Sequence, residues 1–289
     1  MSVIFTDSGC DVLPEYLEKY SIKEIYMPFC LGDREYTKRG EISLNEFYQK
    51  LRNGVQVKTS SLNPQLYKEI FTPILEEGKD IIYIHFSGQM SGTWNQLAVA
   101  TSELKQEFPE RQIDVIDSQN ISAGAGLLVV EVAKRNSDGM PHKELVNWAK
   151  QNRNQFSTYF FVDDLKHLKK GGRISAATAF VGMVLNIKPL LHCADNGKLK
   201  IIGKAIGKKK SLLELVSYAK KYGKELTNYP FIILHSDAPD DAEELKNLVL
   251  QNLGSNLKIS IGEVETTVGT HCGPGTVALF FHAPQLIIE

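Results

Sequence analysis

Short apolar runs rich in β-branched residues alternate with helix-like segments along the first half of the chain. The runs cover residues 3–6, 25–29, 81–86 and 113–117, and most of them lack polar alternation. Strands of this kind are buried on both faces, as in parallel sheets. Helical periodicity and capping residues follow at 43–54, 64–78, 91–108, 122–135 and 141–155. The alternation predicts a mostly parallel sheet covered by helices on both faces.

The second half of the chain has a different texture. Strands expected at 198–204, 231–235, 258–263 and 277–282 carry more polar alternation, and two long helices, at 211–226 and 239–253, lie between them. Further strands are expected at 158–162 and 185–191. This pattern favours a two-layer α/β sandwich with one face of its sheet covered. A length of 289 residues is typical of about two domains, so we expect an N-terminal α/β domain over 1–157 and a C-terminal sandwich domain over 158–289.

Composition excludes several classes of partner and site. The 33 Lys+Arg balance 34 Asp+Glu, so no global field gathers nucleic acid or an anionic membrane. The four cysteines lie far apart and fit neither a disulfide framework nor a zinc site, and no metal or cofactor is expected. The first apolar run meets Asp7 too soon for a signal peptide, and no run approaches the roughly 18 residues of a membrane span. We therefore expect a soluble, reduced, cytoplasmic protein.

Familiar catalytic and phosphate-binding motifs are absent from the sequence. It contains no G-x-G-x-x-G, no G-x-x-x-x-G-K-[ST], no G-x-S-x-G and no H-E-x-x-H. The glycine pair Gly124 and Gly126 is followed by apolar residues and is interpreted as a helix-packing feature.

Hydroxyl residues and glycines gather instead where strands meet helices. Four such clusters occur, at residues 6–9, 59–61, 87–93 and 117–118. Ligands bind beyond the carboxyl ends of strands in open α/β sheets, and hydroxyls with helix N-terminal N–H groups suit an anion such as a carboxylate. Helix capping is the competing interpretation of each cluster taken alone.

Three segments of the second half add charged residues to this picture. Arg173 follows the double glycine at 171–172, Lys188 interrupts an apolar strand, and His271 precedes a Gly-Pro-Gly sequence. Glycine permits positive φ and close backbone approach, so we expect His271 to lie in a turn. A histidine in such a turn is a candidate for function, with a structural role as the alternative.

The order and spacing of these motifs resemble the DegV family over nearly the whole chain. The matching segments are residues 6–8, 58–60, 87–93, 117–118, 168–174, 188–189 and 270–275. The resemblance implies a parallel-sheet N-terminal domain, a two-layer C-terminal domain and a fatty acid in a tunnel, with its carboxylate near the domain junction. Members are bacterial fatty acid-binding proteins, and characterised members are the lipid-carrying subunit of a fatty acid kinase.

The resemblance also implies roles for individual residues. Thr59 would hydrogen-bond the carboxylate, Ser91 with the Gly92 N–H would make the second contact, and His271 would face the carboxylate from the second domain. Ser60 and Thr270 are further head-group or turn positions. Arg173, implied to be exposed, would contact the kinase partner, together with Lys204 and Lys208.

This chain departs from the family pattern at three positions. Leu62 replaces a proline, Met90 replaces a leucine, and Ile206 stands where an arginine of the kinase-facing surface is usual. Lys208 and its neighbours offer charge near Ile206, but lysine lacks the bidentate fork of arginine. The departure at Ile206 therefore bears on the kinase partner more than on lipid binding.

A long acyl tail supplies affinity because each buried CH₂ contributes roughly 0.8 kcal/mol. The site around the head group therefore needs only to orient it. We expect no catalysis by the chain itself: it would present the carboxylate to a separate ATP-dependent fatty acid kinase, which forms an acyl phosphate, and would touch membranes only transiently. Phe180, Met183, Val184 and Leu185 are candidate tunnel walls. The alternatives are a carrier of another apolar carboxylic acid with no kinase partner, and a hydrolase using Ser91, His271 and Asp117.

Overall fold

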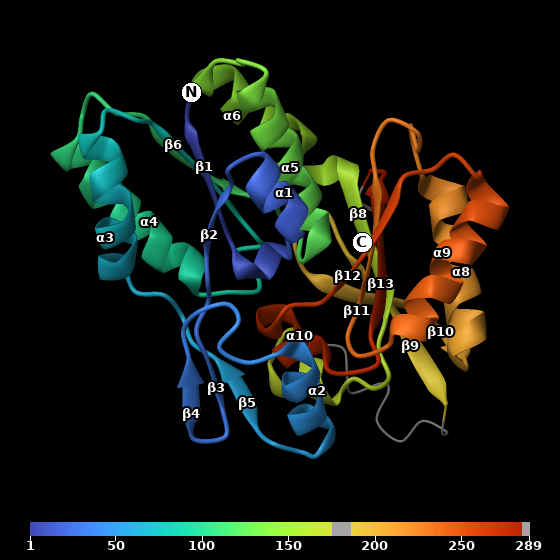
Figure 1. Ribbon diagram of the computed structural model, residues 1–289. Helices are drawn as coiled ribbons and strands as arrows, with labels where there is room; N and C mark the ends of the chain where they lie inside the picture. The colour runs from blue at the N-terminus through green and yellow to red at the C-terminus, as the bar shows by residue number, and fades with distance from the viewer. Residues whose placement is uncertain (175–185, 285–289) are drawn as a thin grey trace.

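A parallel four-stranded sheet forms the centre of the first half of the chain. The computed structural model describes residues 1–174 and 186–284. The sheet has the order β2 (Lys23–Ile25), β1 (Val3–Asp7), β6 (Ile81–His85) and β7 (Ile113–Asp117), with every neighbouring pair parallel (Figure 1). All five residues of β6 are buried, as expected for a strand without polar alternation. The predicted parallel sheet is confirmed.

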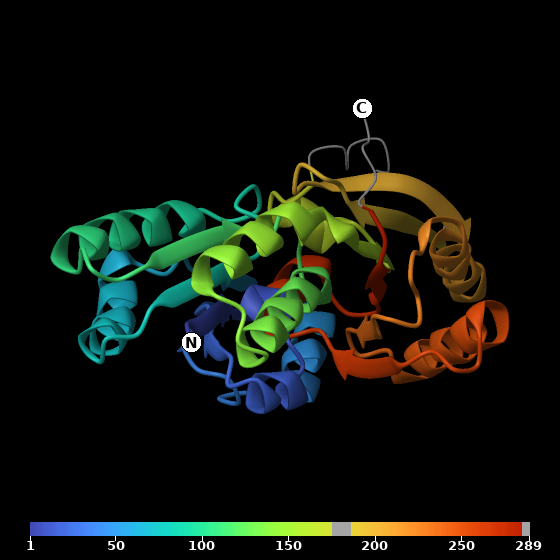
Figure 2. The same cartoon turned by 90° about the horizontal axis from the view of Figure 1, so that it is seen from above.

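Helices cover both sides of this sheet. The helices α3 (Pro64–Glu76) and α4 (Thr93–Glu107) pack together on one side, and α5 (Ala123–Ser137) lies on the other (Figures 1 and 2). The helix α6 (His142–Asn152) packs on α5, and α1 (Pro14–Lys19) links β1 to β2. The start of α3 is set by its sequence, because the Asn63 side chain accepts a hydrogen bond from Leu66 N–H and Pro64 follows it.

A small antiparallel sheet, absent from the sequence prediction, lies beneath the first sheet. It joins β4 (Arg34–Tyr36), β3 (Phe29–Leu31) and β5 (Val57–Thr59), and α2 (Leu44–Arg52) packs beside it (Figure 1). The single strand predicted at 25–29 is wrong: β2 ends at Ile25, and β3 begins at Phe29 in another sheet. Pro28 lies between them and has no N–H to give to a ladder, which favours the break.

The second half is built on a six-stranded mixed sheet. Its order is β10 (Leu199–Ile206), β9 (Ile187–Cys193), β8 (Phe156–Phe161), β13 (Val277–His282), β11 (Phe231–His235) and β12 (Ile259–Glu263). Only the β11–β12 pair is parallel among these described strands. The helices α8 (Lys208–Tyr222) and α9 (Pro239–Leu253) cover one face. The short helices η1 (Ser8–Cys10), η2 (Arg153–Gln155), α7 (Lys166–Lys170) and α10 (Thr266–Cys272) complete the described elements.

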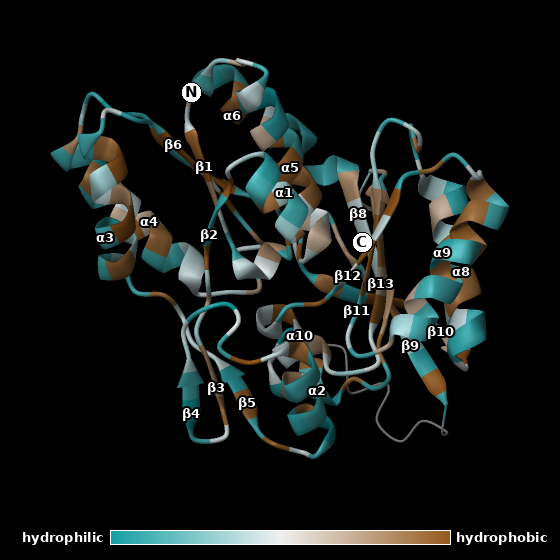
Figure 3. Ribbon diagram, in the orientation of Figure 1, coloured by the Kyte–Doolittle hydropathy of each residue, from teal (hydrophilic) through white to brown (hydrophobic). Residues whose placement is uncertain are grey.

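Each face of the six-stranded sheet belongs to a different core. Tyr159 and Phe161 pack with α8 and α9, whereas Phe160 and Phe280 belong to the core that includes the first sheet. Apolar residues therefore line the strands on both faces, while the outward sides of the helices are polar (Figure 3). The prediction of one helix-covered face is correct for α8 and α9, and the first half of the chain covers the other face.

The helix α5 lies between the two large sheets, which explains why it is buried along almost its whole length. A Cβ on Gly124 would come within 2.2 Å of the Thr158 hydroxyl, and one on Gly126 within 2.5 Å of the Cys10 carbonyl. The interpretation of this glycine pair as a packing feature is thus confirmed. Among the described residues, no helix combines the length and the apolar character that a membrane span requires.

Candidate functional site

An apolar pocket lies between the two halves of the chain. It measures about 730 Å³, including the open solvent at its mouth. The six-stranded sheet supplies Thr158, Phe160, Ala278 and Phe280 from the face that α8 and α9 leave free. The first half and α10 supply most of the opposite wall, including Gly9, Met27, Phe86, Met90, Ile121, Ser122, Val264, Thr267 and Val268. A pocket lined mostly by apolar side chains suits a ligand with a large apolar part.

One end of the apolar pocket carries polar side chains from both halves. Thr59 is the last residue of β5, and His271 lies near the end of α10. The Thr59 hydroxyl and His271 Nε2 are 3.1 Å apart, and both residues line the pocket. Residues 212 positions apart in sequence therefore meet through a hydrogen bond at the pocket.

His271 is a neutral imidazole with one unused nitrogen. Burial, together with the nearby charges of Arg173 and His167, lowers its pKa to about 4. Its Nδ1 is buried and has no hydrogen-bond partner among the described residues. A Cβ on Gly171 would lie 2.3 Å from this nitrogen, so the glycine leaves room for the ring. The expectation that His271 lies in a turn is wrong: it belongs to α10, and positive φ begins at Gly273.

Arg173 lies at the same end of the pocket. It is half-buried rather than exposed, which corrects the implied surface position. Its Nε donates to the Met90 carbonyl at 3.0 Å, and Nη1 donates to the Gly171 carbonyl. Two backbone acceptors thus hold the guanidinium beside the pocket, where it provides a positive charge. Burial lowers the pKa of Arg173, yet an arginine stays protonated in proteins.

The other predicted head-group residues lie at different depths. Ser91 lines the pocket, and its hydroxyl accepts a hydrogen bond from Thr93 N–H at 3.2 Å. Gly92 is the exposed N-cap of α4. Ser60 follows Thr59 and donates its N–H to the Pro28 carbonyl. The Thr270 hydroxyl donates to the Thr266 carbonyl inside α10, so it is engaged within the helix.

The two predicted lysines line neither the apolar pocket nor any part of the wall that carries Thr59 and His271. Lys204 is exposed on β10 opposite Pro189, and Lys208 begins α8 and pairs with Asp241. Ile206, at the position where the family usually has arginine, is 69% exposed. The structure therefore brings together Thr59, Ser91, His271 and Arg173, and not Lys204 or Lys208.

A larger polar cleft adjoins the polar end of the pocket. Thr59, Arg173, His271 and Cys272 line both spaces. The other charged residues of the cleft are Arg52, Lys58, Lys166, Lys170, Asp163 and Asp164, with His167 beside them. Asp163 pairs with Lys188 at 2.8 Å, and Arg52 pairs with Asp237. The Thr59–His271 end of the apolar pocket thus opens toward a charged cleft.

The three residues of the alternative hydrolase, Ser91, His271 and Asp117, each have other hydrogen-bond partners. His271 Nε2 is bonded to Thr59, and Asp117 Oδ1 accepts the N–H groups of Gly88 and Gln119. No hydrogen bond joins Ser91, His271 and Asp117, all of which are described. Within the described ranges, no three His, Cys, Asp or Glu side chains cluster as metal ligands.

Most pocket-lining residues escaped the sequence analysis. Phe160, Ala278 and Phe280 lie on strands that are apolar on both faces, so no alternation marked the pocket side. The glycine at 273 with φ of 74° is a helix C-terminal signal that could have indicated α10. The proposed tunnel residues Phe180, Met183, Val184 and Leu185 lie outside the described residues.

Comparison with known proteins agrees with this architecture. The model of the DegV family matches residues 1–283. A DegV domain-containing protein of Clostridium perfringens is 35% identical over 281 residues, which are 96% of each chain. A DegV family protein from Thermus thermophilus, solved for its fatty acid binding, has a TM-score of 0.85 at 28% identity and covers 98% of this chain and 99% of its own. A fatty acid-binding DegV protein from Streptococcus agalactiae has a TM-score of 0.84 at 28% identity, with 99% of both chains covered. The chain belongs to the DegV family.

Proposed function

We propose that this protein binds a long-chain fatty acid in the apolar pocket and holds its carboxyl group at the polar end. The observation that carries the proposal is the Thr59–His271 contact, which places polar atoms at one end of a pocket lined mostly by apolar side chains. Fatty acid binding by family members of the same fold, from Thermus thermophilus and Streptococcus agalactiae, supports it.

The tail would supply most of the affinity. A 16-carbon chain gains on the order of 10 kcal/mol from burial, from which the loss of ligand freedom subtracts several. The aromatic rings of Phe86, Phe160 and Phe280 line the pocket and would contact methylene groups.

The head group needs orientation and a counter-charge. Thr59 and Ser91 offer hydroxyl donors, and the Gly92 N–H lies next to Ser91 at the start of α4. The guanidinium of Arg173 stabilises the ionised carboxylate, because an isolated buried anion would otherwise be protonated. Neutral His271 can donate one hydrogen bond to the carboxylate without adding charge.

We infer further that the bound carboxylate is presented through the polar cleft to a separate ATP-dependent fatty acid kinase. The cleft reaches the head-group residues and carries Lys58 and Lys170 near its opening. In this scheme the chain itself performs no catalysis: the kinase transfers the phosphoryl group and the acyl phosphate forms at the mouth of the pocket.

Native mass spectrometry of the purified protein tests the first step. A bound species with the mass of a fatty acid supports the proposal. An empty protein that no added fatty acid stabilises contradicts it. Binding of a different apolar carboxylic acid, with fatty acids excluded, would favour the alternative carrier.

Incubation of the loaded protein with ATP and the kinase encoded in the same organism tests the second step. Acyl phosphate formation supports presentation. Tight fatty acid binding without acyl phosphate would leave the carrier role and remove the kinase partner. Release of product from an ester by the protein alone would favour the hydrolase.

A further inference from the structure

Four consecutive residues at the start of α10 each make a polar contact with the first fifty residues of the chain. The Val264 carbonyl accepts from the Tyr48 hydroxyl at 2.6 Å, and the Glu265 N–H donates to Asp11 Oδ1 at 3.1 Å. Thr266 shares a hydrogen bond with Tyr26, and the hydroxyls of Thr267 and Ser8 are 2.7 Å apart. We call these four contacts the α10 clamp.

The clamp crosses between the two halves of the chain. Residues 264–267 end the connection from β12 and begin α10, both in the second half. Their partners are Ser8 in η1, Asp11 directly after it, Tyr26 after β2 and Tyr48 in α2. Ser8 and Asp11 are 0% and 3% exposed, and Thr266 and Thr267 are 1% and 4% exposed. Hydrogen bonds between such buried groups are costly to lose, because each unpaired partner stays away from water.

Charged side chains reinforce the same end of the helix. Arg39 pairs with both Glu24 and Glu265, and Glu265 is the N-cap residue of α10. The Ser8 hydroxyl also accepts the Met27 N–H at 2.9 Å, and Met27 lines the apolar pocket. Ser8 therefore links a pocket wall of the first half to α10.

The other end of α10 carries His271. His271 lies five positions after Thr266, which is about 7.5 Å along the helix at 1.5 Å per residue. Beyond it, Gly273 and Gly275 have φ of 74° and 83°, so the exit from the helix is a glycine turn. A Cβ on Gly269 would lie 2.5 Å from the Tyr48 hydroxyl oxygen, so α10 also packs closely on α2.

From this geometry we propose that the α10 clamp positions His271 against Thr59, so that Ser8 and Tyr26 are positioning residues of the head-group site. The inference rests on the proposed function. The clamp holds one end of a rigid helix relative to the small sheet that carries Thr59, and the 3.1 Å contact lies at the other end. Neither Ser8 nor Tyr26 lines the pocket. Tyr26 acts through the helix, whereas Ser8 acts through the helix and also through the Met27 N–H that it holds.

The test compares palmitate with methyl palmitate, which have the same tail and different head groups. The variants are Ser8→Ala, Tyr26→Phe and the pair combined. We expect the double variant to lose about tenfold in affinity for palmitate, which corresponds to about 1.4 kcal/mol, with the methyl ester changed less than twofold. Each single variant is expected to lose a smaller factor in affinity for palmitate, again with little change for the methyl ester.

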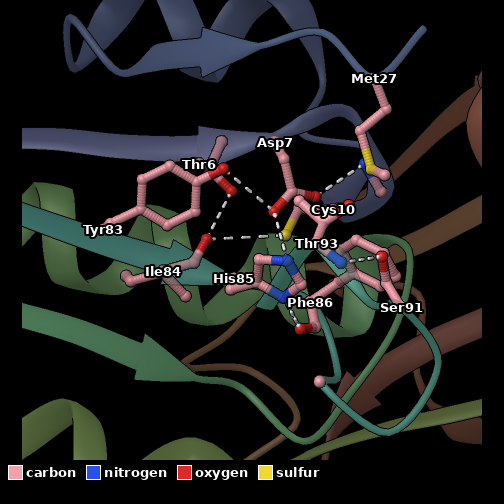
Figure 4. A network of polar contacts seen from close by, with 12 residues as sticks. Thr6, Asp7, Cys10, Met27, Tyr83, Ile84, His85, Phe86, Ser91 and Thr93 are labelled. Carbon is pink, nitrogen blue, oxygen red and sulfur yellow. Dashed lines mark hydrogen bonds and ion pairs between the residues drawn. The ribbon is translucent and has the colours of Figure 1, made fainter. Parts of the chain in front are cut away.

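The matched control is Thr6→Val. Thr6 is fully buried, lies two residues before Ser8 and donates to the Ile84 carbonyl at 3.0 Å, entirely within the first sheet (Figure 4). The Thr6→Val variant should have a lower melting temperature and an unchanged ratio of the affinity for palmitate to the affinity for methyl palmitate. Thr59→Val serves as the direct-contact reference and should lower the ratio.

If the double variant loses the same factor in affinity for palmitate and for methyl palmitate, while Thr59→Val still lowers the ratio of the two affinities, the positioning role is overturned. If the wild-type protein binds neither ligand, the proposed function fails and the inference fails with it. Should Ser8→Ala not fold, Tyr26→Phe removes a single oxygen and decides the question alone.

Discussion

Asp7 shows how strongly one buried residue can tie the stability of this protein to pH. It is fully buried at the end of β1, and burial raises its pKa to about 8, although the Gly9 N–H opposes the rise. Tyr83 and His85 face it, and burial lowers the pKa of His85 to about 4. Both Asp7 and His85 are therefore neutral near pH 7.

Asp7→Asn should remove this pH dependence. The folded state keeps the Asp7 proton up to about pH 8, whereas the unfolded chain loses it near 3.8, so the wild-type protein loses stability as pH rises between these values. We expect the free energy of unfolding of the variant to gain on the wild type from pH 5 to pH 8, measured by urea unfolding. The exposed Asp33→Asn is the control, and parallel curves for Asp7→Asn and wild type would refute the expectation.

Gly171 and Gly172 are glycines for different reasons: the first leaves space for a neighbouring side chain, and the second has a positive φ. Gly171 has an ordinary φ of −73°, and its missing Cβ leaves room for His271. Gly172 has a φ of 70°, and no atom lies within 4 Å of the position that a Cβ would take there. Gly171→Ala should therefore disturb the ring of His271, and Gly172→Ala should only strain the backbone.

We expect Gly171→Ala to weaken fatty acid binding several-fold in a calorimetric titration. Gly172→Ala should leave the affinity unchanged and lower the free energy of unfolding by about 1 kcal/mol, the usual cost of a left-handed conformation with a Cβ. The reverse pattern would place the ligand head away from His271.

Among the elements, the strands and long helices were predictable and the short pieces between them were not. The buried strands β1, β6 and β7 and the helices α3, α4 and α5 follow from apolar runs, caps and periodicity. The strands β3, β4 and β5 have three residues each, too few for a periodic signal. The helix α10 has a threonine- and glycine-rich sequence of low helix propensity, and the α10 clamp that holds it comes from residues more than 200 positions away.

The candidate site was predictable only in part for the same reason. Thr59, Ser91, His271 and Arg173 were named from the resemblance, and they line one pocket. The pocket walls and the clamp depend on contacts between distant segments, which no local pattern in the sequence encodes. The domain division at residues 157 and 158 remains a prediction, as does the cytoplasmic location.

The pair of His142 and Asp114 joins α6 to β7, the strand at one edge of the first sheet. His142 begins α6, and its Nε2 lies 2.9 Å from Asp114 Oδ2 on β7, while its Nδ1 lies 2.8 Å from the Ser2 hydroxyl. The hydrogen bond to His142 lowers the pKa of Asp114. Asp114 thus stabilises the folded state above its unfolded pKa of 3.8, and this stabilisation is lost as pH falls through the lower folded value.

Asp114→Asn should lower the free energy of unfolding at pH 7 by roughly 0.5 kcal/mol, a small effect because solvent screens this partly exposed side chain. The difference from the wild type should shrink as pH falls below 4, when measured by urea unfolding. A difference that stays constant from pH 7 to pH 3 would show that the charge of Asp114 contributes nothing.

For the whole molecule, the position of the pocket couples the two halves. Residues of the first half of the chain form one wall of the pocket, and the six-stranded sheet of the second half forms another, so a ligand there contacts both halves. A ligand that binds only the folded state adds RT ln(1 + [L]/Kd), about 2.7 kcal/mol at 100 times Kd.

We therefore expect a saturating fatty acid to raise the melting temperature by several degrees in scanning calorimetry, with one transition moving as a unit. Thr59→Val is the control, and its shift at the same ligand concentration should be smaller. A ligand that moves only one of two resolved transitions would contradict a site shared by both halves.

Successive side chains of β8 and β13 point in turn toward the α8–α9 layer and toward the pocket. Tyr159, Phe161 and Leu279 anchor the α8–α9 layer, while Phe160 and Phe280 face the pocket from the same strands. A substitution at a pocket position leaves its sequence neighbours, and the helices they support, on the opposite side of the sheet. Descendants of such a chain can thus acquire new acyl-chain preferences one side chain at a time without refolding the scaffold that carries them.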